Sequence, residues 1–276
     1  MIWNEVRFQT LTDIALGNSD SALNNQLLAE ALLEGYVATQ VLAVRRLMDD
    51  RKKDVISFRR LVRDIKGNWR LFTRENYVCF DGLPYDYEAV QHQVLMERAG
   101  RGFFWDEKSG PKAFGTSQMA HEQFDRLTGI SAQLRRRDDR LPTSIIAKIE
   151  HWLNASGADD LAKWSHAHLA HAGGPESRKR IEHLTVTTGK IKDAIRALAR
   201  AIEAISAYVL YASGRSRSLV PVALFDVFEN FDHPVMSSDT FHDAELRWRC
   251  LSDERDGYLD AVESELCSAN ARQGAP

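Results

Sequence analysis

The sequence predicts an all-α protein, and three observations support this prediction. From Lys190 onward, apolar residues recur at alternating steps of four and three, which places them on one stripe of a helix with 3.6 residues per turn. They are Ile191, Ile195, Leu198, Ile202, Ile205 and Val209. A second long segment, from about Asn24 to Asp50, is rich in Ala and Leu and has a similar stripe. The chain has no series of alternating apolar and polar segments of the kind that forms a sheet.

The first two helices are expected to form a hairpin. The helix at 24–50 carries the stripe Leu33, Val37, Val41, Val44 and Met48. The next segment, from Val55 to about Trp69, places Phe58, Leu61, Val62 and Ile65 on one side. Only a short polar turn at 49–54 separates them, so they should pack antiparallel.

The remaining elements follow from the same reasoning. Helices are expected around 84–99, 117–128, 143–154, 158–172, 190–209 and 239–266, with Gly and Pro marking the breaks. Thr187 or Thr188 can cap the helix that starts near 190, and Gly214 follows its end. Segment 219–231 is compatible with a short strand, but Pro221 favours an edge or irregular segment.

Composition sets the class of protein. The chain has 276 residues, of which 44% are apolar and 27% charged, and this suits a single helical domain over 1–276. Lys and Arg total 36 against 39 Asp and Glu, for a net charge of −3. This balance excludes a globally basic nucleic-acid coat but leaves room for a local basic face.

The sequence predicts a cytoplasmic protein without membrane contact. No apolar run approaches the ~18 residues of a membrane span, and the N-terminus lacks the pattern of a secretory signal. Cys79, Cys250 and Cys267 are odd in number and far apart, which favours reduced thiols over a disulfide framework or a zinc site.

The segment from Lys163 to Ala172 has the most unusual local composition, because three of the nine histidines fall within six residues. The spacing of His166, His168 and His171 superficially matches the HxHxDH signature of metal-dependent hydrolases, but Ala170 stands in the place of its Asp. A metal site is therefore a distant alternative. Ser165 beside His166 lacks the glycines of a nucleophile elbow.

Two interpretations of this segment remain open. Histidine titrates near neutral pH and suits proton transfer in metal-free RNA cleavage, with Lys163, two turns before His171, stabilising the phosphate. Alternatively, Trp164, His168 and His171 form one partly buried helix face with a structural role.

Basic residues form the second candidate feature. The predicted hairpin carries the basic residues Arg45, Arg46, Arg51, Lys52, Lys53, Arg59, Arg60 and Arg63, interrupted by aspartates. A run at 135–137 is followed at once by Asp138 and Asp139. Mixed charge of this kind is typical of solvated helix faces with ion pairs. An RNA site would require these arginines to converge in space.

Two segments together resemble a known family. Val41 to Ile65, VLAVRRLMDDRKKDVISFRRLVRDI, resembles the first helical hairpin of the abortive-infection, AbiU-like branch of the HEPN superfamily. The stretch 56–62, ISFRRLV, corresponds to an "I-S-L-x-x-L-L" segment of these relatives. Leu161 to Gly173 resembles their "K-Y-L-A-H-A/S-D" helix end, most closely at 169–172. The resemblance covers roughly residues 24–212.

The resemblance implies a HEPN-like helical bundle at about 24–212, a C-terminal helical extension at about 213–276, and a homodimer. Active members of the superfamily cleave RNA without metal through an Arg-x4–6-His motif. His171 matches the His of this motif, but Ser165 occupies the usual Arg position. A literal match from Arg178 to His183 follows the Gly-Gly-Pro break and lies in the wrong context.

We therefore expect a prokaryotic protein of a phage-defence or toxin system that acts on RNA. His171, His166 and Lys163 are the candidate catalytic residues, and Arg45, Arg46, Arg59 and Arg60 the candidate RNA-binding residues. No cofactor is expected, and a cognate antitoxin protein is an expected partner. The alternative is a protein- or RNA-interaction module of the same fold without catalysis, and the distant alternative is a hydrolase with a metal at His166, His168 and His171.

Overall fold

The computed structural model describes residues 1–48, 56–99, 106–170 and 175–211, together with a few isolated positions between 224 and 253. Every regular element in this part of the chain is helical, and Thr73 and Arg140 form an isolated β-bridge. The predicted all-α class is confirmed. The predicted helix at 239–266 and segment 219–231 lie almost wholly outside the described residues.

The α-helices are α1 (Ile2–Gly17), α2 (Gln26–Met48), α3 (Phe58–Gly67), α4 (Arg74–Val78), α5 (Tyr87–Glu97), α6 (Phe114–Thr128), α7 (Thr143–Ala155), α8 (Ala158–Ser165), α9 (Pro175–Lys179) and α10 (Thr188–Glu203). Single 3-10 turns are η1 (Ala22–Asn24), η2 (Trp69–Leu71), η3 (Phe80–Gly82) and η4 (Ala132–Leu134). Two π-helical turns, η5 (His166–Ala170) and η6 (Ala204–Val209), extend α8 and α10.

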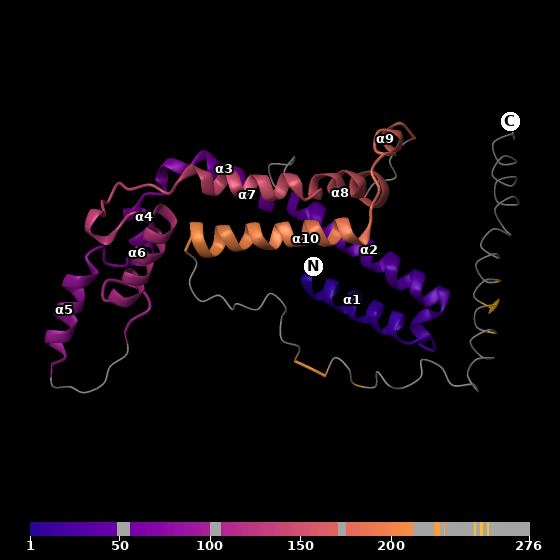
Figure 1. The fold of residues 1–276 in the computed structure, drawn as a ribbon, viewed down its shortest axis with the longest axis horizontal. Helices are drawn as coiled ribbons and strands as arrows, with labels where there is room; N and C mark the ends of the chain where they lie inside the picture. The colour runs from indigo at the N-terminus through magenta and orange to yellow at the C-terminus, as the bar shows by residue number, and fades with distance from the viewer. Residues whose placement is uncertain are drawn as a thin grey trace, which may run out of the picture.

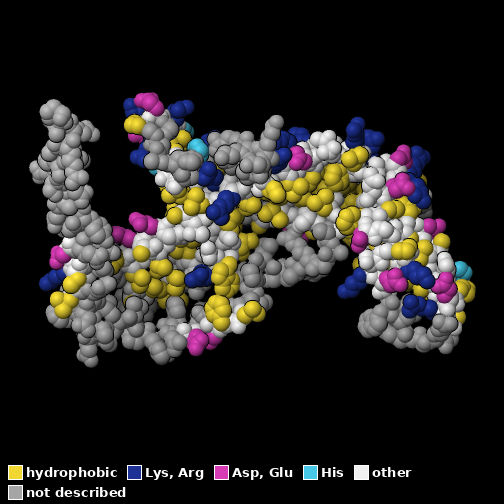
Figure 2. Space-filling model, turned by 180° about the vertical axis from the view of Figure 1, so that it is seen from behind, with side chains coloured by type: hydrophobic (Ala, Val, Ile, Leu, Met, Phe, Trp, Pro, Cys, Tyr) yellow, Lys and Arg dark blue, Asp and Glu magenta, His cyan; other side chains and the backbone are white. Residues whose placement is uncertain are grey.

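The helices form an elongated body with a smaller group at one end (Figure 1). In the long part, α7 and α8 follow one another alongside α10, and α2 crosses to meet α1. The smaller group contains α4, α5 and α6. One continuous core runs through both parts and includes Val44, Phe124, Ile149 and Leu198. Figure 2 shows apolar side chains in a band over the central helices, with most charged side chains around its margins.

The main partner of α2 is α8, not α3. The contacts of α2 with α8 are more extensive than those with α3, which also contacts α7 and leads toward α4 in Figure 1. The expected α2–α3 hairpin is therefore a minor contact, and its turn lies outside the described residues. Leu61, which was expected on the inner face of α3, is 41% exposed.

The first half of α2 is largely uncovered. Its buried residues begin at Tyr36, and Leu27 and Leu33 are exposed. By length and composition alone, α2 could cross a membrane, because an 18-residue window has a mean hydropathy of 1.4. In the structure, 22% of that window is buried. A core helix of a soluble protein passes the same criterion.

Candidate functional site at the end of α8

The histidine-rich segment begins on α8, which is the helix that packs most extensively on α2. Gly157 adopts a left-handed conformation (φ 72°) at the joint between α7 and α8, where a residue with a side chain would be strained. Asp159 and Asp160 lie in the first turn, which suits the positive end of the helix dipole. Ala158, Leu161 and Ser165 are buried and anchor the helix.

The α-helix changes to a π-helical turn at His166. Within η5, His166 is half-buried, Ala167 is buried and His168 is exposed. A π turn inserts an extra residue into the helical register, so side-chain directions differ from those of a regular α-helix. The prediction that His168 and His171 share a face rests on α-helical geometry, and His171 lies outside the described residues. Such turns frequently occur at functional sites.

Trp164 and His168 form a stacked pair at the surface. Their ring centroids lie 4.6 Å apart with an interplanar angle of 12°. The Nδ1 atom of His168 lies 3.2 Å from the main-chain oxygen of Trp164. The pairing of these two rings confirms that they share a helix face, but His168 is on the exposed side of it.

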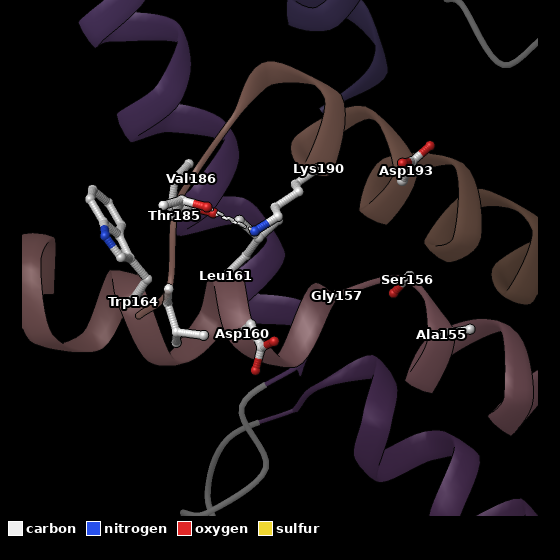
Figure 3. Close-up of a pocket in the computed structure, with 11 residues that line it drawn as sticks. Ala155, Ser156, Gly157, Asp160, Leu161, Trp164, Thr185, Val186, Lys190 and Asp193 are labelled. Atoms are coloured by element: carbon white, nitrogen blue, oxygen red, sulfur yellow. Dashed lines mark hydrogen bonds between the residues drawn. The ribbon is translucent and has the colours of Figure 1, made fainter. Parts of the chain in front are cut away.

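A pocket of about 300 Å³ lies between α8 and the segment that leads into α10. It is lined by Asp160, Leu161 and Trp164 from α8 and by Thr185 and Lys190 from the other side (Figure 3). The Lys190 ammonium donates hydrogen bonds to the main-chain oxygen and Oγ1 of Thr185, at 2.9 and 3.0 Å. The site thus offers an aromatic ring, a cation and a carboxylate around one cavity.

The structure brings two of the three predicted catalytic residues together on one helix end, and the third is not described. Lys163 has a 64% exposed side chain, and its ammonium lies 3.1 Å from Asp160 Oδ1. His166 follows one turn later. His171 lies outside the described residues. Ser165, which the sequence resemblance predicts to occupy the Arg position of the HEPN motif, is fully buried, and its Oγ has no hydrogen-bond partner among the described residues.

The four predicted RNA-binding arginines lie on two helices, Arg45 and Arg46 near the end of α2 and Arg59 and Arg60 at the start of α3. Arg59 of α3 forms an ion pair of 2.8 Å with Asp159, so it connects α3 to the first turn of α8. Arg60 lies 4.0 Å from Asp64 on its own helix. Arg45 is half-buried and Arg46 exposed in the last turns of α2. Arg59 therefore has an interhelical role that the sequence did not predict.

Sequence analysis missed a second polar cluster, around Arg74 in the group of α4, α5 and α6. Arg74 is fully buried and forms ion pairs with Asp125 at 2.7 Å and Asp139 at 2.9 Å. Its guanidinium carbon lies 4.5 Å from the centroid of the Phe124 ring. Arg135 also pairs with Asp125, at 2.6 Å. The cluster ties α4, α6 and the 135–140 loop together.

This cluster changes the interpretation of the charged run at 135–139. Ion pairs are present, as mixed charge suggests, but the partners are distant: Arg135 pairs with Asp125 and Arg137 with Glu75, while Asp139 accepts from Arg74. The alternation of Arg and Asp was a signal of ion pairing. The partners could not be identified because none lies within the run, and Glu75 and Arg74 are 62 and 65 positions away from Arg137 and Asp139.

His121 is the buried histidine of the same region. It is 2% exposed, its Nε2 lies 2.9 Å from the main-chain oxygen of Tyr85, and its ring packs against Tyr85 and Tyr87. Burial lowers the pKa of His121 below its ordinary value, outweighing the hydrogen bond to Tyr85. A neutral, enclosed imidazole of this kind has a structural role.

Within the described ranges, no group of three or more His, Cys, Asp or Glu side chains is arranged to bind a metal ion. Comparisons of the chain with protein-family models, with curated proteins and with solved structures find no match.

Proposed function

We propose that the end of α8 contacts RNA in a HEPN-like protein of a prokaryotic defence or toxin system, and that His171 and His166 transfer protons in metal-independent cleavage. The observation that carries this proposal is the π-helical turn η5, which begins at the half-buried His166, three residues after Lys163 and two after Trp164, and Trp164 lines a pocket together with Lys190. Imidazoles supply proton transfer near neutral pH, and ammonium groups attract phosphate.

The chemistry of the pocket suits a nucleotide. Trp164 is half-buried, so its indole can contribute a stacking surface, and base–aromatic stacking contributes about 1–3 kcal/mol per base. Lys190 lines the pocket together with Trp164, and Lys163, which precedes Trp164 in the chain, has an exposed side chain. The carboxylate of Asp160 partly neutralises the positive charge of Lys163, because the two side chains form an ion pair. Binding of RNA would therefore exchange the Lys163–Asp160 pair for a contact with phosphate.

A second candidate is RNA binding without cleavage, and buried Ser165 favours it. In active members of the superfamily an Arg at this position contributes to the motif, but here the position holds a fully buried Ser. No cation can therefore act from position 165. Lys163, which lies two residues earlier and is exposed, is the only cation in α8 and has to supply the charge in the catalytic version of the proposal.

The test is cleavage and binding of end-labelled RNA by the purified protein in EDTA. The proposal expects cleavage by the wild type, a loss of about 10²-fold or more in His171→Ala and His166→Ala, and weaker binding by Lys163→Ala. His92→Ala, which alters an exposed histidine on α5, is the matched control and should behave as wild type. Binding without cleavage would support the second candidate, and absence of both would contradict the proposal.

The proposal includes a homodimer in the cytoplasm and a cognate antitoxin protein as partner. The dimer follows from the family resemblance, in which two copies of the motif meet at the interface. Sedimentation analysis should give about twice the chain mass of 31.3 kDa. A strictly monomeric protein that still cleaves RNA would contradict the shared-site arrangement.

A further inference from the structure

A groove of about 880 Å³ is lined by residues of α1, α7 and α10, and it shares no lining residue with the pocket beside Trp164. Its apolar lining comes from five helical elements: Ile2 of α1, Leu127 of α6, Ile145 and Trp152 of α7, Ile195 of α10, and Tyr208 of η6. Trp152 and Ile145 are only partly buried. The described residues therefore leave a sizeable apolar surface open along α10.

A stripe of basic residues follows this groove. Lys192, Arg196 and Arg200 recur every fourth residue on α10, are exposed and line the groove. The Arg200 guanidinium carbon lies 4.3 Å from the Trp152 ring centroid, and the Lys148 ammonium lies 5.9 Å from the same ring. Glu5 and Glu203 also line the groove, so its cations outnumber its carboxylates. The surface suits an acidic, apolar occupant.

An acidic and apolar segment follows the described helices in the same chain. The last continuous described residue, Tyr211, is three residues beyond Tyr208 of the groove lining. Between Arg217 and Arg247 the sequence has no Lys or Arg and contains Asp226, Glu229, Asp232, Asp239, Asp243 and Glu245. Residues 222–231, VALFDVFENF, are mostly apolar. Leu224 and Phe225 are 100% and 69% exposed, so these side chains also lack a covering surface among the described residues.

The chain between Tyr211 and residue 222 is long enough for the apolar segment to reach the groove. Ten residues, 212–221, join Tyr211 to the apolar segment, and an extended chain spans up to about 3.3–3.6 Å per residue. The tether is therefore long enough to return to a groove that starts beside its own origin. A short tether also gives the segment a high effective concentration at the groove compared with a separate partner.

We propose that residues 222–231 dock in this groove of the same chain, with their apolar side chains on Trp152, Ile195 and Tyr208. Asp226 and Glu229 then lie near the basic stripe of Lys192, Arg196 and Arg200. This contact covers the open face of α10 and connects the C-terminal part of the chain to the helical body. The proposal does not depend on the RNA-cleaving function.

The test uses the full-length protein with benzoylphenylalanine in place of Tyr208, irradiated and mapped by mass spectrometry. Mixing ¹⁴N- and ¹⁵N-labelled protein separates crosslinks within a chain from those between chains. We expect crosslinks within the chain to the peptide that contains 222–231. Crosslinks only between chains, or only to other segments, would overturn the proposal.

Charge variants make the test specific. Arg196→Glu with Arg200→Glu should lower the yield of this crosslink several-fold, and 1 M salt should lower it because the charges are screened. The matched control is Arg178→Glu with Lys179→Glu on α9, which should leave the yield unchanged. Leu224→Asp with Phe225→Asp should also lower the yield, and these side chains are exposed, so folding of the helical body is not affected. A yield unchanged by the groove variants and by the segment variants would overturn the proposal.

Discussion

Arg74 shows how a single side chain can organise one end of this molecule. A buried guanidinium loses its hydration, and this cost is offset only when carboxylates and hydrogen bonds replace the lost water. Here Asp125 and Asp139 supply the carboxylates, and the Phe124 ring covers one face. One nitrogen, Nη2, has no hydrogen-bond partner among the described residues. Burying these charged groups therefore costs desolvation free energy, and removing one partner costs more, because it leaves the other buried charge unpaired.

Replacement of Arg74 by Met should lower the free energy of unfolding by about 3–5 kcal/mol, because it removes the partner of two partly buried carboxylates. Urea denaturation measures this loss. Arg136→Met is the control, since Arg136 is exposed and should change stability by no more than about 0.5 kcal/mol. Equal effects of the two substitutions would contradict a structural role for the Arg74 cluster.

His121 gives stability a dependence on pH. Burial lowers its pKa in the folded protein below the ordinary 6.5, so the unfolded chain binds a proton that the folded chain does not. Stability should therefore fall as pH decreases below 6.5, by up to about 1.4 kcal/mol per pH unit from this residue until the folded pKa is reached.

The substitution His121→Phe should flatten the dependence of stability on pH between 7 and 5, whatever its effect on absolute stability. Urea denaturation at several pH values gives the slope. His92→Gln, at an exposed position on α5, should retain the wild-type slope. Identical slopes for His121→Phe and the wild type would show that the buried imidazole titrates normally.

Clusters of residues that are neighbours in the chain can be predicted from the sequence, whereas clusters of residues far apart in the chain cannot, as His166 and Arg74 show. The histidine cluster was visible because its members are neighbours in the chain, and the structure places His166 and Lys163 on one helix end. The Arg74 cluster was not visible, since Asp125 and Asp139 are separated from Arg74 by 51 and 65 positions. Only folding brings such partners together.

Among the elements, helix starts are governed by local chemistry that the sequence reveals. Thr187 was a predicted cap, and its Oγ1 accepts a hydrogen bond from the Lys190 amide at 3.2 Å. Ser57 caps α3 in the same way through the Arg60 amide. Loss of such a cap leaves an amide of the first turn without a protein partner.

Thr187→Ala should therefore cost about 1 kcal/mol of stability, because α10 loses its N-cap hydrogen bond. Thr187→Ser keeps the hydroxyl and should cost much less. Thr188→Ala, one residue later, is the control and should have a small effect, since Thr187 provides the cap. Thermal unfolding of the three variants measures these losses. A larger loss in Thr188→Ala than in Thr187→Ala would show that Thr188, and not Thr187, caps α10.

Strong apolar periodicity also predicted the position of a helix and its buried face. The stripe of α10 was correct, with five of its six apolar residues buried and Ile202 half-buried. The π-helical turns η5 and η6 were not predictable, because hydrophobic spacing does not distinguish them from the α-helices that they extend. Helix α1 was missed as well: it has no buried residue, so its sequence carries no strong apolar stripe.

At the scale of the molecule, pairing of distant helices determines the architecture. The sequence placed α2 beside its neighbour α3, yet the extensive contact is with α8, more than 100 residues later. Chain connectivity favours neighbours, whereas burial of the Val41 and Val44 face requires the most complementary surface. This choice depends on side-chain fit, which helical periodicity does not show.

Tyr77 couples the smaller helical group to the long body. It lies on α4, its ring packs against Phe124 of α6 and Tyr211 after η6, and its hydroxyl donates a hydrogen bond of 2.8 Å to the main-chain oxygen of Tyr208. Burial raises the pKa of this hydroxyl, with a further contribution from Tyr211. The side chain thus forms both an apolar and a polar link between residues 131 positions apart.

Removing the whole ring should weaken this coupling more than removing the hydroxyl. Tyr77→Phe should cost about 1 kcal/mol for the lost hydrogen bond, whereas Tyr77→Ala should cost about 3–5 kcal/mol because it also leaves a cavity. In hydrogen exchange, Tyr77→Ala should accelerate the amides of α4 and α6 before those of α2 and α8, since the smaller group then opens separately. Uniform acceleration of all helices would show instead that both parts unfold as one unit, and that Tyr77 contributes to stability without defining a boundary.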